Sequence, residues 1–192
     1  MGNEGKKLLM IVDPQIDFIS GSLTVGGAEE AMLGLSDYVA DSGALYSDII
    51  VTADRHPFNH CSFSCCGGKW ERHCVHDSVG AAVFPSLMEN LYCFRGDVHF
   101  FYKGENPDVE EYSIFKNREA AGCIAGLVEA KGIEEIDICG IAGDVCVSDT
   151  LLDGIRLLPN IKFNVLKRFC PSIDGGTRLD GIVAKYHIPC DK

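Results

Sequence analysis

The sequence predicts an α/β fold of the doubly wound type, a three-layer αβα arrangement around a mainly parallel sheet. Two observations lead to this fold class. Short β-rich segments alternate with segments of helical periodicity, and reactive polar residues follow several of the expected strands. With 192 residues and 46% hydrophobic content, the chain can build its own core, so we expect a single domain over residues 1–192.

The expected elements follow one another regularly along the chain. Strands are expected at residues 7–13, 48–54, 97–103, 135–141 and 162–167. Helices are expected at residues 29–41, 118–131, 145–158 and 177–186. Strand–helix–strand units cross over right-handedly and give parallel strands. Two long segments, 55–80 and 104–116, lack either pattern, and loops of that length usually carry function.

Charge and hydropathy exclude some classes of partner. The net charge of −11 opposes a phosphate-binding surface, so we expect no nucleic acid partner. The apolar runs are too short to cross a bilayer, and the N-terminal residues do not resemble a signal peptide. We therefore expect a soluble cytoplasmic protein with a small-molecule substrate and no membrane partner; a homo-oligomer remains open.

Four polar or reactive residues stand where predicted strands end. Asp13, Asp54 and Lys103 end the first three strands, and Cys146 follows the fourth. Ligands of open α/β sheets bind outside the carboxyl ends of the strands. We therefore expect these side chains to meet in one crevice.

Cys146 is a candidate nucleophile because it lies at a strand–turn–helix junction. There the positive end of the helix dipole is expected to lower the thiol pKa. The alternative is a buried core cysteine. A carboxylate at Asp13 and an ammonium at Lys103 are costly to bury unpaired, so they form either a structural ion pair or a charge network that activates the thiol.

A second group of residues suits a divalent metal. Asp54 and His56 are two apart in an extended segment, so their side chains share a face, and His73 is a third candidate ligand. Three protein ligands leave coordination positions open, as in catalytic sites. His60 is either a fourth ligand or a residue that orders the loop. Zinc is the first choice, with iron or manganese as alternatives.

Ten cysteines show no regular disulfide spacing, and we expect them to be reduced. Cys93, Cys123 and Cys139 are expected to be small buried hydrophobic residues. A structural zinc site is an alternative function for four others, namely Cys61, Cys65, Cys66 and Cys74.

Five motifs in register resemble the nicotinamidase family of isochorismatase-like cysteine hydrolases. They occupy residues 12–18, 52–60, 70–75, 102–104 and 140–147, within a likeness that runs from about residue 8 to 167. Three departures concern the pocket rim: Arg55 replaces the family's usual aromatic residue, Glu71-Arg72 stands where proline is common, and the pair Cys65-Cys66 is unusual.

The resemblance implies a six-stranded parallel sheet and hydrolysis of nicotinamide to nicotinate and ammonia. It implies a thioester on Cys146, activated by Asp13 and Lys103, and one metal ion that orients the pyridine ring. The implied metal ligands are Asp54, His56 and His73.

The resemblance also assigns backbone and pocket groups. It implies an oxyanion hole at the N–H groups of Ala142 and Cys146, after a cis peptide between Ile141 and Ala142. Phe18 and Trp70 match positions that pack on the ring, and Tyr112 is a further candidate for the same pocket.

Three alternatives remain open. Another isochorismatase-like amide hydrolase, such as an N-carbamoyl amide hydrolase, is the first, although such relatives generally lack the metal set. A nucleotide- or flavin-binding module is disfavoured because no Gly-x-Gly-x-x-Gly follows Asp13. The third is a cysteine-rich metal-binding protein without turnover.

Overall fold

A computed structural model describes residues 6–191, which form a parallel sheet covered by helices on both faces. The five strands lie in the order β3-β2-β1-β4-β5. Their bounds are β1 Lys6–Val12, β2 Asp48–Asp54, β3 Asp97–Lys103, β4 Ile133–Gly140 and β5 Lys162–Val165. All five predicted strands are confirmed, and their ends differ from the expected ones by two residues at most.

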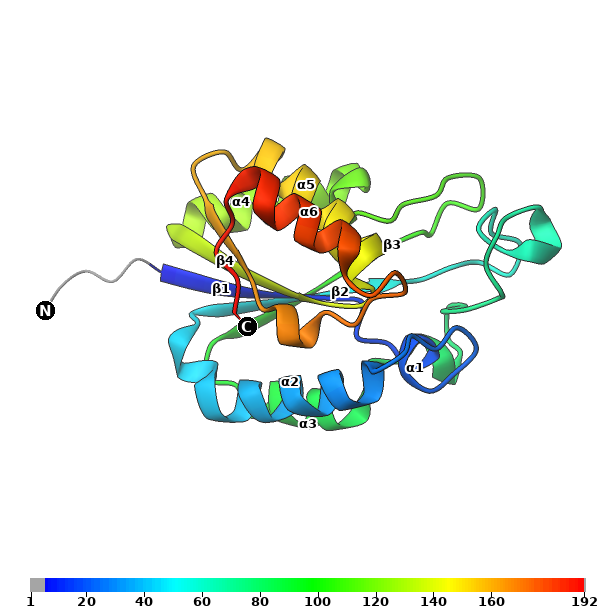
Figure 1. Cartoon of the computed structure of the whole chain (residues 1–192), viewed down its shortest axis with the longest axis horizontal. Helices are drawn as coiled ribbons and strands as arrows, with labels where there is room; N and C mark the ends of the chain where they lie inside the picture. Colours follow the sequence, from blue (N-terminus) through cyan, green and yellow to red (C-terminus); the bar gives the residue numbers. More distant parts are fainter. Residues whose placement is uncertain (1–5, 192) are drawn as a thin grey trace, which may run out of the picture.

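Helices form the outer layers of the molecule. α2 (Ala28–Ser42) and α3 (Pro85–Tyr92) cover one face, and α4 (Arg118–Lys131), α5 (Ser148–Leu157) and α6 (Thr177–Tyr186) cover the other (Figure 1). The four predicted helices are confirmed. The short α1 (Ile16–Ile19) and α3 were not predicted.

The α4 boundaries show how local sequence sets an element. The Asn117 side chain accepts hydrogen bonds from the N–H groups of Glu119 and Ala120 and so caps the first turn. Gly132 ends the helix in the left-handed region at φ 65°, which glycine adopts without a steric cost. No described helix is long and apolar enough to span a membrane.

The expected sixth strand is wrong for the part of the chain that the structure describes. The segment after α6 reaches the edge of β5 but makes a single parallel bridge there, between Val165 and Cys190. Hydrogen bonds from Val165 N–H to Pro189 and from Asp191 N–H to Val165 flank that bridge. Among the described residues this contact is an isolated bridge and not a strand.

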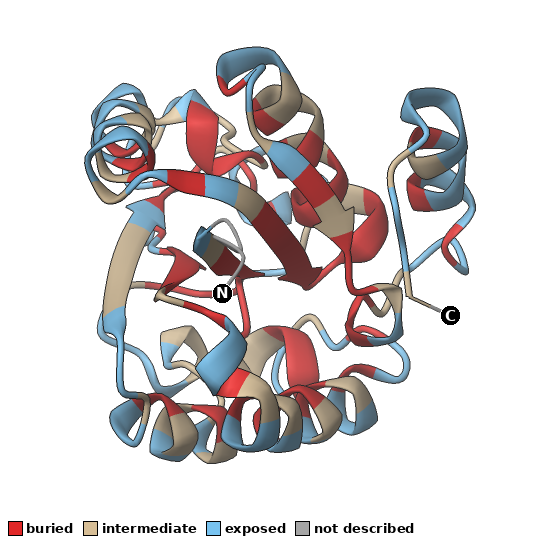
Figure 2. Cartoon of the chain, turned by 90° about the vertical axis from the view of Figure 1, so that its left-hand side faces the viewer, coloured by how far each residue is buried: buried red, intermediate tan, exposed pale blue. Residues whose placement is uncertain are grey.

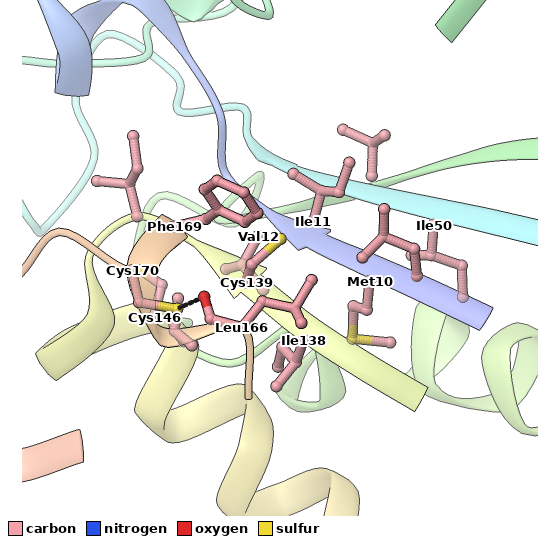
Figure 3. Packing of buried hydrophobic residues seen from close by; sticks show 14 of the residues in the cluster. Met10, Ile11, Val12, Ile50, Ile138, Cys139, Cys146, Leu166, Phe169 and Cys170 are labelled. Atoms are coloured by element: carbon pink, nitrogen blue, oxygen red, sulfur yellow. Dashed lines mark hydrogen bonds between the residues drawn. The ribbon is translucent and has the colours of Figure 1, made fainter. Parts of the chain in front are cut away.

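The core lies on both sides of β1, whose residues Leu8 to Val12 are completely buried. β2 and β4 pair with it on either side, and the helices turn their apolar faces toward this central layer (Figure 2). Val12 and Cys139 lie close to the Cys146 region in the packed interior (Figure 3). The candidate nucleophile therefore sits directly on the core.

Of the three cysteines expected in the core, only Cys139 is buried. Cys123 lies on the outer face of α4, and Cys93 follows the last residue of α3; both are exposed. Apolar neighbours in the sequence do not show that a helical residue is buried, because a helix that covers a sheet buries only one of its faces.

Candidate active site

The long segments that follow β2 and β3 extend from the same end of the sheet, where the carboxyl ends of the strands meet (Figure 1). Asp13 lies at this edge and is completely buried. Its backbone is left-handed at φ 48°, an uncommon conformation for a residue with a side chain. Thr52 Oγ1 donates a hydrogen bond to Asp13 Oδ1 at 2.7 Å. The carboxylate is thus held in one orientation.

Lys103 joins the charged groups of the edge. Its ammonium lies 2.8 Å from Asp13 Oδ2, donates to Asp54 Oδ1, and approaches Cys146 Sγ to 3.6 Å. Burial acts to lower the pKa of Lys103, but the two carboxylates outweigh burial and raise that pKa well above its usual value. Lys103 is therefore a fixed positive charge beside the sulfur.

The turn that carries Cys146 differs from the expected helix start. Residues Gly143–Val147 form a π-helical turn, and α5 begins only at Ser148. The peptide between Ile141 and Ala142 is cis, as the resemblance implied. None of the described backbone hydrogen bonds outside regular elements uses the Ala142 N–H, which leaves it free for a ligand oxygen.

The expected low pKa of Cys146 is wrong for this structure. Burial raises the pKa of the thiol well above its usual value, and the nearby Asp13 and Asp54 carboxylates add to the rise that Lys103 opposes. Burial likewise raises the pKa of Asp13. A thiol with a raised pKa needs a base to activate it as a nucleophile. An Asp13 oxygen lies within 4.8 Å of Cys146 Sγ.

The structure brings together the three expected metal ligands. Potential ligand atoms of Asp54, His56 and His73 lie within 4.8 Å of one another, and all three residues are buried. His56 Nδ1 lies 3.0 Å from the Gly104 carbonyl, and His73 Nδ1 lies 2.7 Å from the Glu71 carbonyl. Each Nδ1–H donates to its carbonyl, which leaves each Nε2 lone pair for a metal.

These donors fit a divalent ion. A carboxylate with two imidazoles is a common donor set for zinc and related metals. Burial lowers the pKa of His73 and favours its neutral form. Burial opposes ionisation of Asp54, but Lys103 and His56 lower the pKa of this carboxyl overall. Beside the donors, the hydroxyl of Ser62 is buried without a hydrogen-bond partner in the described chain, a polar atom that a bound ligand would satisfy.

Gly104 and Gln15 support this site and were not predicted. Gly104 has φ 69°, and a Cβ there would meet His56 Cε1 at 2.3 Å, so only glycine fits beside the ring. The Glu111 carboxylate accepts the Gly104 N–H. The Gln15 side chain donates to the Asp54 carbonyl and accepts the Asp54 N–H, which fixes the end of β2.

His60 stands behind the metal group. Its Nε2 bonds to the Val109 carbonyl, its Nδ1 accepts the Ser62 N–H, and its ring stacks on that of His56 at 4.1 Å between centroids. Both ring nitrogens are occupied, so the fourth-ligand alternative is disfavoured and the loop-ordering alternative fits the contacts.

We expect His73→Ala to lose bound metal and His60→Ala to keep most of it. The first change removes one of three ligands, whereas the second removes a ring that stacks on a ligand, a loss that typically weakens metal binding by roughly ten- to a hundredfold. Elemental analysis after dialysis measures both. Equal metal loss in the two variants would mean that His60 ligates directly.

The structural zinc site is not assembled. Across residues 6–191, the groups of potential ligands close enough to share an ion include none of the four cysteines proposed for it. Cys65 and Cys66 are exposed, with 3.8 Å between their sulfurs, while Cys74 is buried. Cys65 and Cys66 are thus close to each other, but they do not form a shared ligand group with Cys61 and Cys74.

An apolar pocket lies above Cys146. The predicted Phe18, Trp70 and Tyr112 line it together with Asp54, His73, Ala142 and Cys146. Trp70 Nε1 donates to the Tyr112 hydroxyl at 3.1 Å, which fixes two of the aromatic walls. Sequence analysis did not identify the remaining lining residues, which are Leu23, Val25, Ser62, Glu110, Val145 and Ile173.

A parallel sheet that brings a buried cysteine, a lysine and a carboxylate to its carboxyl edge, beside an open carboxylate–imidazole set, has the architecture of a cysteine hydrolase. The isochorismatase domain matches residues 7–157. The chain therefore belongs to the isochorismatase domain family.

Individual relatives are consistent with this family. The chain is 34% identical over 155 residues to a nicotinamidase/pyrazinamidase of Mycobacterium tuberculosis, covering 78% of this chain and 79% of the relative. A Leishmania infantum protein, PnC1 in complex with nicotinate, superposes with a TM-score of 0.85 at 28% identity, covering 98% of this chain and 93% of that one. A Pyrococcus horikoshii pyrazinamidase in complex with zinc superposes with a TM-score of 0.82 at 27% identity, covering 97% of this chain and 99% of that one.

Proposed function

We propose that this protein is a nicotinamidase, which hydrolyses nicotinamide to nicotinate and ammonia through a thioester on Cys146. The observation that carries the proposal is that a candidate nucleophile and candidate metal ligands line one pocket. Cys146 lines this pocket with Lys103 and Asp13 close to its sulfur, and two of the candidate metal ligands, Asp54 and His73, line the same pocket. The relatives with nicotinamidase names support the choice of amide.

In the first half of the reaction, Asp13 takes the proton of Cys146 as the sulfur attacks the amide carbonyl carbon. The fixed charge of Lys103 stabilises the thiolate. The carbonyl oxygen becomes an oxyanion, for which the backbone N–H groups of Ala142 and Cys146 are the proposed donors. Asp13 returns the proton to the nitrogen, and ammonia leaves.

In the second half, water attacks the thioester carbon. Asp13 takes a proton from that water and passes it to the sulfur as the C–S bond breaks. Nicotinic acid leaves and ionises to nicotinate, its proton passing to solvent, where ammonia takes it up. The thiol and carboxylate return to their starting states. Burial raises the pKa of Asp13, which makes its carboxylate a stronger base than that of an exposed aspartate.

Asp54, His56 and His73 are the proposed ligands of one divalent ion, with zinc first and iron or manganese as alternatives. When bound, that ion would offer an open position to the pyridine nitrogen. Phe18 and Trp70 would pack against the ring and keep it in the apolar pocket.

The test compares nicotinamide with benzamide, which has the same shape but lacks the pyridine nitrogen. We expect ammonia release from nicotinamide and a kcat/KM for benzamide that is lower by a factor on the order of 10², because a site built for a polar atom rejects the analogue without it. Removal of metal with a chelator should abolish this preference.

Metal-free protein that hydrolyses both amides equally well would contradict the proposal. That outcome would assign the chain to a metal-independent branch of the family. A protein that holds metal but releases no ammonia from either amide would instead support a metal-binding function without turnover.

A further inference from the structure

The segment at residues 171–178, which we call the C-terminal strap, lies beyond the residues that the family domain matches and contributes to the pocket. It leads into α6 at the end of the sheet where the functional loops gather (Figure 1). Its Ile173 lines the pocket together with Cys146, although its side chain is 56% exposed. A large aliphatic side chain therefore stands at the pocket mouth.

The strap is tied to the turn that carries Cys146. The Asp144 carboxylate accepts hydrogen bonds from the backbone N–H groups of Ile173 at 2.9 Å and Asp174 at 3.0 Å. The Gly143 N–H donates to the Pro171 carbonyl at 2.9 Å. Hydrogen bonds to an ionised acceptor are about twice as strong as neutral ones. The position of Ile173 is thus set from the nucleophile turn itself.

A second anchor lies on the other side of Ile173. Arg178 donates to the Asp144 carbonyl at 2.7 Å and to the Asp149 carboxylate at 2.6 Å. The Asp174 carboxylate accepts the N–H groups of Gly176 and Arg178 and closes the turn into α6. Ile173 is therefore exposed but held between two anchors, unlike a side chain on a free loop.

We propose that Ile173 is a specificity-determining residue, which limits the size of the aromatic amide at the pocket mouth, and that Asp144 is the residue that positions it. This inference rests on the proposed function. The substrate class that it predicts is compact: single-ring aromatic carboxamides are accepted, and fused-ring carboxamides are excluded by the Ile173 side chain.

The experiment compares nicotinamide with quinoline-3-carboxamide, which carries a fused second ring. Ile173→Ala should raise the ratio of kcat/KM for the larger amide over nicotinamide by at least about tenfold, and Ile173→Phe should lower it, since even one methylene in a pocket discriminates by that much. Leu157→Ala is the matched control, because Leu157 is a similarly exposed aliphatic residue at the end of α5, outside the described pocket lining.

Asp144→Asn tests the anchor. The amide retains only one acceptor oxygen, so one of the two strap bonds is lost. We expect the ratio of kcat/KM for quinoline-3-carboxamide over nicotinamide to rise, as in Ile173→Ala, with a larger effect on KM than on kcat. The double variant should show less than the sum of the two single effects. A purely structural role of Asp144 would lower stability and kcat without changing the ratio.

Binding separates this inference from the proposed function. Calorimetric affinities of both amides for metal-loaded Cys146→Ala protein, with and without Ile173→Ala, report pocket size without turnover. A shifted affinity ratio in the Cys146→Ala background, together with a wild-type protein that releases no ammonia from nicotinamide, would uphold the role of Ile173 and overturn the proposed function. Unchanged ratios in both the alanine and the phenylalanine variants would overturn the role of Ile173 alone.

Discussion

Replacing Cys146 by alanine should abolish amide hydrolysis and leave the fold and the pocket intact. The change removes the proposed nucleophile but only one sulfur atom from a position that is 6% exposed. Without a thiol no thioester can form, and we expect residual ammonia release below about 1% of wild type, a barrier increase of at least roughly 2.7 kcal/mol. A discontinuous ammonia assay under saturating nicotinamide measures this.

The control for Cys146→Ala is substrate binding. Trp70 is the single tryptophan of the chain and lines the pocket, so its fluorescence reports occupancy directly. Nicotinamide should change that fluorescence in the variant as in the wild type. Activity well above the percent level, with binding preserved, would mean that water attacks the amide without a cysteine intermediate.

Asp13→Asn should produce the second largest loss, a fall in kcat of at least roughly 10², within the range typical of a lost general base. Asparagine keeps the size of the side chain but cannot take the Cys146 proton, and it leaves the Lys103 ammonium with Asp54 as its remaining carboxylate. Without a carboxylate to take the thiol proton, alkylation of Cys146 by iodoacetamide at neutral pH should also slow. Both rates are measured on the same preparation.

Thr52→Val is the matched control for this prediction. It removes the hydroxyl that orients Asp13 but retains the carboxylate, so the loss should be clearly smaller. Unchanged iodoacetamide kinetics at Cys146 in Asp13→Asn would reject Asp13 as the base.

The elements that the sequence predicted well are those encoded by periodicity. Strands and long helices carry that pattern, and parallel pairing then brings Asp13, Asp54 and Lys103 to one edge. The eight-residue helix α3 escaped prediction because a short proline-initiated segment resembles a loop. The order of the strands, and the limit of five strands within residues 6–191, depend on tertiary pairing that local sequence does not encode.

The parts of the site that escaped prediction depend on long-range contacts. Gln15 reaches the backbone of Asp54, and Ile173 reaches the pocket from beyond the motifs. Neither residue belongs to a chemically distinctive class, so sequence alone offers little signal. The Cys146 pKa was assigned the wrong direction because burial, which depends on the whole fold, exceeds the expected effect of a helix end.

The distribution of the site over the sheet has a consequence for how the protein loses activity. Lys103 ends β3 and Cys146 follows β4, and these strands lie on opposite sides of β1, whose residues Leu8 to Val12 are completely buried. Neither half of the sheet can hold the reactive groups alone, so no partly opened form should retain a fraction of the turnover. Activity in denaturant should therefore fall together with the amide hydrogen-exchange protection of β1, the segment expected to open only on global unfolding.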